Sequence, residues 1–196
     1  SAEELISLFD LNRVGRSAAR FDFAKLENLN GLYIRNSSHE YLVDALEKFL
    51  PELPDGAALA PRFRVLRDRV LAIMPGLKER AKTLIELFDG TRFLFAERPL
   101  PLEEKAKTIL SAQARAILGR AIPVLEATEW KSVPLDAAVR QLAERENVKL
   151  AAVAQPLRAA LTGKSTSTGI FDVLTALGKD ESIARLRDQA GKSVAA

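Results

Sequence analysis

Apolar residues recur at helical spacing along almost the whole chain, and this periodicity is the feature that most restricts its fold. Asp22 is placed to cap one such helix, in which Leu26, Leu29, Leu32 and Tyr33 form a stripe on one face. We find no run of alternating apolar and polar residues as long as a strand. The pattern therefore predicts an all-α protein of about a dozen short helices in two packed groups, with the apolar stripes facing inward.

Proline and capping residues divide the first half of the chain. Ser37 and Glu40 have the spacing of a capping box, and Pro51 prevents the helix that follows them from continuing. We expect residues 51–60 to form a loop. A new helix should begin at Pro61, because proline is favoured at the first helical position.

Further breaks follow. Pro75-Gly76 predicts a turn, and residues 91–95 are either a helical turn or a brief strand. The two closely spaced prolines of residues 98–102 favour an extended connection between two subdomains. Beyond it, helices are expected over residues 103–109, 111–127, 134–146, 150–162, 169–177 and 180–189. The natural C-terminal stops are Asn147, Gly163 and Gly178.

Composition excludes several classes of protein. The chain has 196 residues, 0 cysteines and 1 histidine, so disulfides, thiol catalysis and histidine-rich metal sites are ruled out. No apolar run reaches the ~18–20 residues that a membrane helix needs, and the first residues do not resemble a secretory signal. We therefore expect a cytoplasmic protein with no membrane partner.

Three motifs could carry chemistry, but each is better explained by structure. Gly163-Lys164-Ser165 resembles the tail of a P-loop, but the required upstream glycine is replaced by Arg158 and a helix precedes it. His39 lies in the first turn of a predicted helix, where one sequence shows no partner for it. Carboxylate pairs occur at helix starts, where negative charge favours the helix dipole. We predict no catalytic residue and no metal site.

Arginines and lysines gather in several places. Two clusters stand out, one at residues 13–25 and one at residues 62–69, and Arg158 and Lys164 follow near the C-terminus. A net charge of +3 does not distinguish a nucleic-acid-binding surface from solvated helix faces. For any single cluster, a solvated face is the commoner explanation.

Several motifs together resemble bacterial glutamyl-tRNA synthetases. They are Val14-Gly15-Arg16-Ser17-Ala18, Phe21-Asp22-Phe23-Ala24-Lys25-Leu26, Arg80-Ala81-Lys82-Thr83-Leu84 with Glu86-Leu87, Pro156-Leu157-Arg158 running to Gly163, Gly169 to Leu174, and Arg185-Leu186. They occur in the order found in that family and span residues 1–190. The resemblance is to the C-terminal, tRNA-binding portion of these enzymes.

The resemblance implies a chain that recognises tRNA(Glu) and does not itself catalyse. The family's class I catalytic motifs are missing, so ATP, magnesium and glutamate would bind to a catalytic domain that this sequence lacks. Residues 1–75 resemble the stem-contact region and the start of a helical cage. Residues 76–127 and 128–196 resemble two anticodon-binding subdomains of that cage. The chain would be a fragment of the enzyme or, as the alternative, a natural stand-alone domain; we expect a monomer without a DNA partner.

The resemblance also assigns roles to particular residues. Those implied to contact the anticodon are Arg80, Arg158, Ser167, Thr168, Gly169 and Ile170, with Thr168 standing where the family has proline. Those implied to contact the tRNA backbone are Arg16, Lys25 and Lys164. A helical protein–protein interaction module without an RNA role is the main alternative. An unrelated small enzyme is the third hypothesis.

Overall fold

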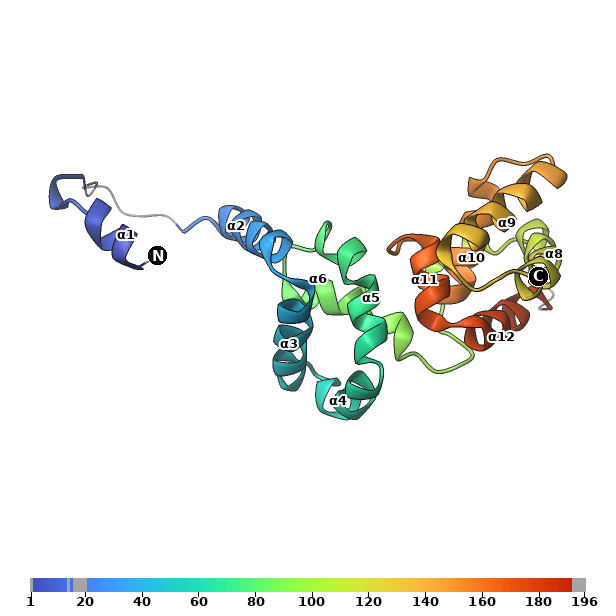
Figure 1. Cartoon of the computed structure of the whole chain (residues 1–196), viewed down its shortest axis with the longest axis horizontal. Helices are drawn as coiled ribbons and strands as arrows, with labels where there is room; N and C mark the ends of the chain where they lie inside the picture. Colours follow the sequence, from blue (N-terminus) through green and yellow to red (C-terminus); the bar gives the residue numbers. More distant parts are fainter. Residues whose placement is uncertain (1, 14, 16–20, 192–196) are drawn as a thin grey trace.

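The computed structural model describes residues 2–13, 15 and 21–191. Within them the chain forms twelve α-helices and three short 3-10 helices and no strand, so the all-α prediction is confirmed. Helix α1 (Ala2–Leu8) and the 3-10 turn η1 (Leu11–Arg13) bury no residue and lie at one end of the molecule (Figure 1).

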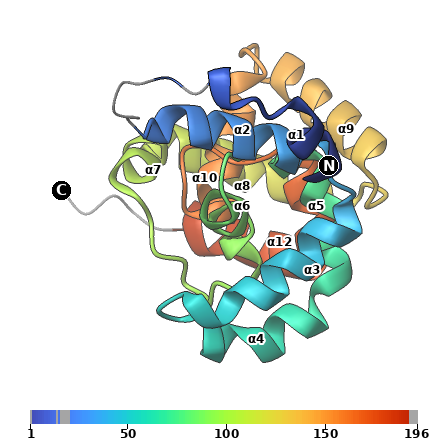
Figure 2. The same cartoon turned by 90° about the vertical axis from the view of Figure 1, so that its left-hand side faces the viewer.

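The first helical group spans residues 23–95. It contains α2 (Phe23–Asn36), α3 (His39–Phe49), η2 (Leu50–Glu52), α4 (Gly56–Val65), α5 (Arg67–Lys78), α6 (Leu84–Asp89) and η3 (Arg92–Leu94). Both α3 and α4 lie below α2 in two perpendicular views (Figures 1 and 2). Phe95 joins these elements at their centre, because its ring stacks on Phe63 and on Phe88 with centroids 5.9 and 6.0 Å away.

The second helical group spans residues 104–190. It contains α7 (Glu104–Ile109), α8 (Ala112–Glu126), α9 (Ser132–Arg145), α10 (Ala151–Thr162), α11 (Ile170–Leu177) and α12 (Lys179–Ala190). These helices match the six predicted ranges closely. Three of them end as expected, because Asn147, Gly163 and Gly178 have positive φ angles of 52°, 73° and 79°.

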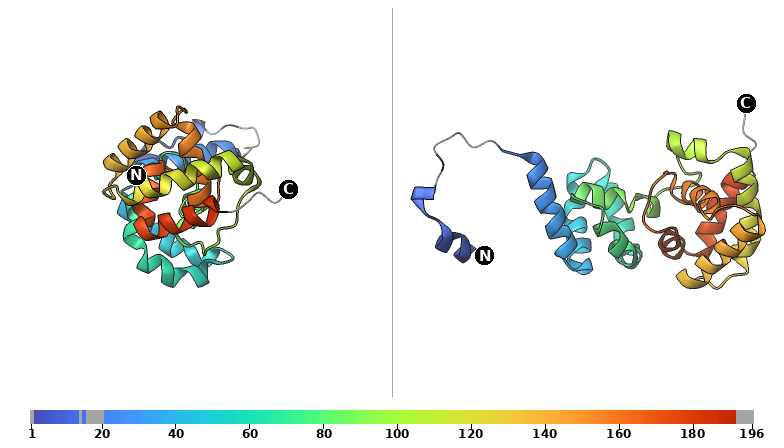
Figure 3. Two further views of the ribbon diagram at one scale, coloured as in Figure 1. Left: turned by 90° about the vertical axis from the view of Figure 1, so that its right-hand side faces the viewer. Right: turned by 90° about the horizontal axis from the view of Figure 1, so that it is seen from above.

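The two groups lie side by side along the long axis of the molecule, joined by the extended segment 96–103 (Figures 1 and 3). Helix α5 of the first group packs on α11 of the second. Arg69 of α5 donates a hydrogen bond to the carbonyl oxygen of Leu177 at the end of α11, 3.0 Å away. The buried residues of both groups form one continuous apolar cluster, so the groups are a single packed unit.

Capping explains where several helices begin. The Asp22 carboxylate accepts a hydrogen bond from the Lys25 amide, as predicted for α2. The prediction that Ser37 caps α3 is wrong by one residue: Ser38 accepts from the Tyr41 amide at 3.1 Å. Ser37 instead ends α2, and its hydroxyl donates to the carbonyl oxygen of Tyr33.

The predictions at Pro61 and Pro75-Gly76 are wrong, whereas α3 ends at Phe49, before Pro51, as predicted. Residues 51–60 are not a loop throughout, because α4 begins at Gly56, and Pro61 lies inside that helix. Pro75-Gly76 is likewise inside α5 and forms no turn. A helix-interior proline costs about 3 kcal/mol. In α5 the burial of Val70, Ile73, Met74 and Leu77 outweighs that cost.

The apolar stripe of α2 does not face inward as predicted. Leu26, Leu29, Leu32 and Tyr33 are 48–68% exposed, and only Gly31 and Ile34 of this helix are buried. Nothing among the described residues covers that face. No helix in the described ranges combines the length and apolar composition needed to cross a bilayer.

Candidate nucleic-acid interface

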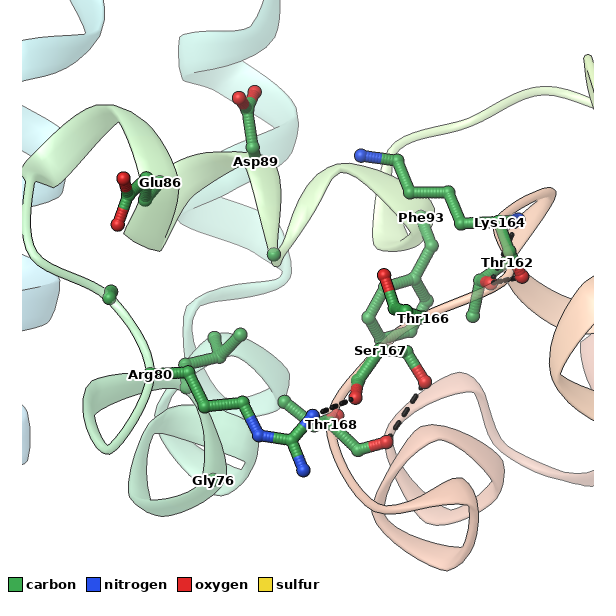
Figure 4. Close-up of a pocket in the computed structure, with 13 residues that line it drawn as sticks. Gly76, Arg80, Glu86, Asp89, Phe93, Thr162, Lys164, Thr166, Ser167 and Thr168 are labelled. Atoms are coloured by element: carbon green, nitrogen blue, oxygen red, sulfur yellow. Dashed lines mark hydrogen bonds between the residues drawn. The ribbon is translucent and has the colours of Figure 1, made fainter. Parts of the chain in front are cut away.

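A pocket of about 370 Å³ lies between the two helical groups. One wall comes from the end of α5 and from α6, and the other from the segment that links α10 to α11 (Figure 4). The pocket therefore brings together residues that are about 85 positions apart in the sequence, Arg80 and residues 164 and 166–168. Every residue of the predicted anticodon set except Arg158, Gly169 and Ile170 lines it.

Arg80 and Arg158 converge on Ser167, Arg80 from the first helical group and Arg158 from the second. Arg80 lies in the turn just after α5 and donates from Nη1 to the Ser167 carbonyl oxygen, 2.9 Å away (Figure 4). Arg158 projects from α10 and donates from Nε to the Ser167 hydroxyl, also at 2.9 Å. That hydroxyl in turn donates to the Thr168 carbonyl oxygen. These bonds use only part of each guanidinium group, which carries five N–H donors.

The electrostatics of the two arginines is unusual. Burial lowers the pKa of the Arg158 guanidinium, and the positive charge of Arg80 lowers that pKa further. The guanidinium group nevertheless keeps its positive charge, because arginine is not deprotonated in proteins at neutral pH. No carboxylate of the described residues forms an ion pair with either arginine or with Lys164. The pocket is lined by two cations, Arg80 and Lys164, and by two carboxylates, Glu86 and Asp89, of which Asp89 pairs with Arg92. With Arg158 beside it, the side of the pocket near Ser167 favours an anionic or electron-rich partner.

Thr168 and the start of α11 complete the wall. Thr168 is 4% exposed, and its Oγ1 atom is buried without a hydrogen-bond partner among the described residues. An unsatisfied buried hydroxyl costs about 1–3 kcal/mol, and this one is too enclosed for a bound group to reach it. Gly169 is the N-cap of α11, and Ile170 is 6% exposed within the core, which leaves little of its side chain at the surface.

Gly163 fixes the start of this segment. Its φ of 73° is in the left-handed region, and a Cβ there would collide with the carbonyl oxygen of Pro101. Its own carbonyl oxygen accepts a hydrogen bond from the Glu103 amide at 2.9 Å. Gly163 thus ends α10, as predicted, and ties residues 163–169 to the segment that joins the two groups.

Lys164 lies on a ridge between two pockets. It lines the first pocket and also a second one of about 460 Å³, which is bounded by α4, η3 and the segment 96–103. Phe93 and Thr162 are common to both pockets as well. Sequence reasoning missed Phe93, because a single apolar residue in a short 3-10 turn carries no signal of its position.

The other predicted RNA contacts are elsewhere. Lys25 is exposed in the first turn of α2, and the structure does not place it at the pocket. Arg16 lies outside the described residues. The roles implied for these residues, and for the pocket residues, remain predictions.

The arginine cluster at residues 62–69 is occupied by intramolecular bonds. Arg64 pairs with Glu47 at 2.7 Å, and Arg67 pairs with Asp44 at 2.6 Å. Arg62 approaches Glu97 at 3.5 Å. Arg69 donates to the Leu177 carbonyl oxygen. For this cluster the structural explanation holds.

The motifs judged unsuited to catalysis are placed as expected. His39 is the first residue of α3, and Glu103, Glu104, Asp180 and Glu181 lie at or next to the starts of α7 and α12. Within the described ranges, no group of three histidine, aspartate or glutamate residues is arranged to hold a metal ion.

Comparison with known proteins fits this geometry. Residues 41–190 match the family model described as anticodon binding domain. The chain is 60% identical over 193 residues to glutamate–tRNA ligase 1 of Beijerinckia indica and 56% identical over 192 residues to glutamate–tRNA ligase of Bradyrhizobium sp. strain ORS 278. Each alignment covers 97% of this chain and 40–41% of the relative, so the chain spans about two fifths of their length.

Solved structures agree with the sequence relatives. A crystal structure of a glutamate tRNA ligase from Elizabethkingia meningosepticum, in complex with its amino acid, superposes with a TM-score of 0.78 at 25% identity. It matches 97% of this chain and 36% of that protein. Neither these relatives nor this structure supports the alternative of a protein–protein interaction module. The family model covers most of the chain, so the protein belongs to the anticodon-binding domain family, which binds tRNA.

Proposed function

We propose that this chain recognises the anticodon of tRNA(Glu) as the tRNA-binding portion of a glutamate–tRNA ligase. The observation that carries the proposal is the convergence of Arg80 and Arg158 on Ser167, with no carboxylate of the described residues pairing either arginine. A pocket between two helical groups, lined by free donors, suits single-stranded bases. The similarity to glutamate–tRNA ligases supports the choice of RNA.

Anticodon bases are single-stranded, so a protein can turn them outward and pair with their Watson–Crick edges. The free N–H groups of Arg80 and Arg158 would donate to base acceptors. Cytosine and uracil differ in donors and acceptors at the same positions. A wrong base would leave buried donors unpaired, which costs roughly 5- to 150-fold in affinity per lost hydrogen bond.

The remaining residues would hold the RNA without reading it. Lys164 on the ridge and Lys25 on α2 are suited to phosphate contacts, and Gly169 lets the RNA approach the start of α11 closely. Arg16 has the same predicted role. The boundaries between the stem-contact region and the two anticodon-binding subdomains, at residues 75/76 and 127/128, remain predictions. They divide the chain by RNA-binding role, which need not follow the packing of the helices.

The test uses the anticodon stem-loop of tRNA(Glu) and the same stem-loop with a substituted anticodon. We expect the chain to bind the first more tightly. Binding to both RNAs should weaken as salt rises from about 50 to 200 mM, because each phosphate contact releases counter-ions. Equal affinity for the two RNAs would contradict anticodon recognition, and affinity independent of salt would contradict phosphate contact.

The chemistry of the proposed parent enzyme lies outside this chain. That enzyme would join glutamate to tRNA with ATP and magnesium in the cytoplasm. This chain needs no cofactor for recognition, and we expect it to be monomeric. In assays of aminoacylation and of ATP–pyrophosphate exchange it should be inactive. Reproducible activity of a clean preparation would contradict the proposal that this chain recognises tRNA without catalysing the reaction.

A further inference from the structure

Arg185 of α12 is a charged side chain in the interior of the protein. It is 1% exposed and is among the largest fully buried side chains. Burial lowers the pKa of its guanidinium, whereas the hydrogen bond to Glu181 opposes that shift. A buried charge is costly unless hydrogen bonds satisfy it, so the partners of Arg185 indicate what its burial achieves.

The partners of Arg185 come from three separate segments. On its own helix, Nε donates to Glu181 Oε1 at 2.6 Å. From Nη1 it donates to the carbonyl oxygens of Phe93 at 2.9 Å and Leu161 at 2.7 Å. From Nη2 it donates to the Ala96 carbonyl oxygen at 3.3 Å. One guanidinium thus bonds the end of η3, the segment that follows it, and the last turn of α10.

These carbonyl groups lie directly behind the candidate site. Phe93 lines the first pocket and belongs to the first helical group. Leu161 immediately precedes Thr162 and Gly163, where α10 ends and the pocket segment begins. The carbonyl groups at the end of a helix attract positive charge, so a buried cation there joins the two groups at the pocket wall.

We propose that Arg185 is a positioning residue for anticodon recognition. It fixes the position of one pocket wall relative to the other, so that Arg80 and Ser167 lie within hydrogen-bonding distance. This inference rests on the proposed function. Arg185 is behind the wall and contacts no pocket space, so it acts through the segments that it joins. Arginine suits this role, because its planar fork bonds several acceptors at fixed angles.

Other contacts between the two helical groups explain why Arg185 sets their relative position and is not needed to hold them together. Helix α5 packs on α11, and Arg69 bonds the Leu177 carbonyl oxygen at the other side of that contact. Arg98 also approaches Asp188 of α12 at 3.4 Å. The groups therefore stay packed without Arg185, but the ends of η3 and α10 lose their common partner.

The test compares Arg185→Met and Arg185→Lys with a matched control, Arg115→Met. Arg115 of α8 is partly buried and bonds the Gln189 carbonyl oxygen, but both residues belong to the second group. Two measurements are made on each variant. The first is the affinity ratio between the tRNA(Glu) stem-loop and the stem-loop with a substituted anticodon.

The second measurement needs no RNA. The chain has 0 cysteines, so spin labels at Lys48→Cys and Glu144→Cys report the distance between exposed sites on α3 and α9. We expect a narrow distance distribution in the parent and the control. Arg185→Met should broaden it, and Arg185→Lys, which keeps the charge and some of the donors, should broaden it less.

In the binding measurement we expect Arg185→Met to lower the affinity ratio about tenfold, mainly through weaker binding of the correct stem-loop. Arg185→Lys should lower it less, and Arg115→Met should leave it unchanged. A folded Arg185→Met protein with the parent ratio overturns the proposal. If the Met variant does not fold, the Lys variant decides, and a folded Lys variant with the parent ratio and distance overturns it. A parent chain that does not distinguish the RNAs instead contradicts the proposed function.

Discussion

Opposite surroundings distinguish the arginines of residues 62–67 and Arg92 from the two arginines at the pocket, Arg80 and Arg158. In the first helical group, the arginines of residues 62–67 pair with carboxylates of α3 and of residue 97, and Arg92 bonds Asp55 and Asp89. Those carboxylates raise the pKa of Arg92. At the pocket, burial and the charge of Arg80 lower the pKa of Arg158. The arginines of residues 62–67 and Arg92 are thus neutralised by carboxylates, whereas Arg158 has no carboxylate partner among the described residues.

This difference shows why a count of basic residues says little about RNA binding. A paired arginine uses its donors within the protein, and its field is cancelled by the carboxylate beside it. Arg80 and Arg158, which have no carboxylate partner among the described residues, keep free N–H donors and an uncancelled positive field. A net charge of +3 over 196 residues is therefore compatible with a site whose arginines are not paired by any carboxylate in the part of the chain that the structure describes.

The largest effect that the comparison predicts is at Arg158. Arg158→Ala should reduce discrimination between the tRNA(Glu) anticodon and a substituted anticodon by roughly 5- to 150-fold, because the wrong and right bases then meet the same donors. Affinity for the substituted stem-loop should change much less. Binding measured by fluorescence anisotropy with both RNAs provides the ratio.

Arg158→Lys is the matched control. It keeps the positive charge but loses the planar fork. The affinity for the substituted stem-loop should therefore be close to that of the parent, while discrimination between the anticodons stays low. If Arg158→Ala weakens both RNAs equally, Arg158 is a phosphate contact and its assignment to the anticodon is wrong.

Much of the fold was predictable because local signals determine it. The six helices after residue 103 were predicted from apolar spacing and from residues that tolerate left-handed backbone, such as Gly163 and Gly178. Apart from the one-residue shift of the α3 cap and the exposed stripe of α2, the errors lie between residues 51 and 76. There the burial of the α5 stripe overrides Pro75, and no local rule states how much tertiary burial a helix will gain.

The site was less predictable, because its partners are far apart in the sequence. Arg80 and Ser167 are 87 residues apart, and Arg185 and Phe93 are 92 apart. The family resemblance identified Arg80, Arg158 and Ser167 as candidates. The sequence did not distinguish them from the arginines of residues 62–69, whose carboxylate partners lie up to 35 residues away.

The next largest effect is expected at Lys164. Lys164→Gln should weaken binding to both stem-loops several-fold and reduce the slope of log affinity against log salt by about one unit, because one phosphate contact is lost. Discrimination should be retained. Lys25→Gln should act in the same way on full-length tRNA. Salt titrations of both variants with both RNAs measure these effects. A change in anticodon preference would contradict the assignment of Lys164 or Lys25 to a phosphate contact.

A smaller effect is expected in the paired region. Arg67→Ala should change RNA affinity by less than about twofold, because Arg67 already bonds Asp44 and has no free charge to offer. Its loss should lower the free energy of unfolding by about 0–1 kcal/mol, the usual range for a partly exposed ion pair. Urea unfolding measures the stability. A large loss of RNA affinity would show that this cluster also faces the RNA.

The smallest expected effect is a pH dependence of stability at Asp55. Its hydrogen bond with Arg92 lowers the pKa of the Asp55 carboxyl below 3.8, so the folded state binds this proton more weakly than the unfolded state. The stabilisation is therefore complete above the unfolded pKa and is lost as pH falls through the lower folded value. The difference in unfolding free energy between the parent and Asp55→Asn should shrink over that range. Glu52→Gln, which removes a nearby exposed carboxylate, should show a smaller change if the ion pair is the cause. An equal change in both variants would assign the effect to net charge. The Asp55–Arg92 ion pair would then contribute little to stability, and Arg92 would be less strongly neutralised than its bonds indicate.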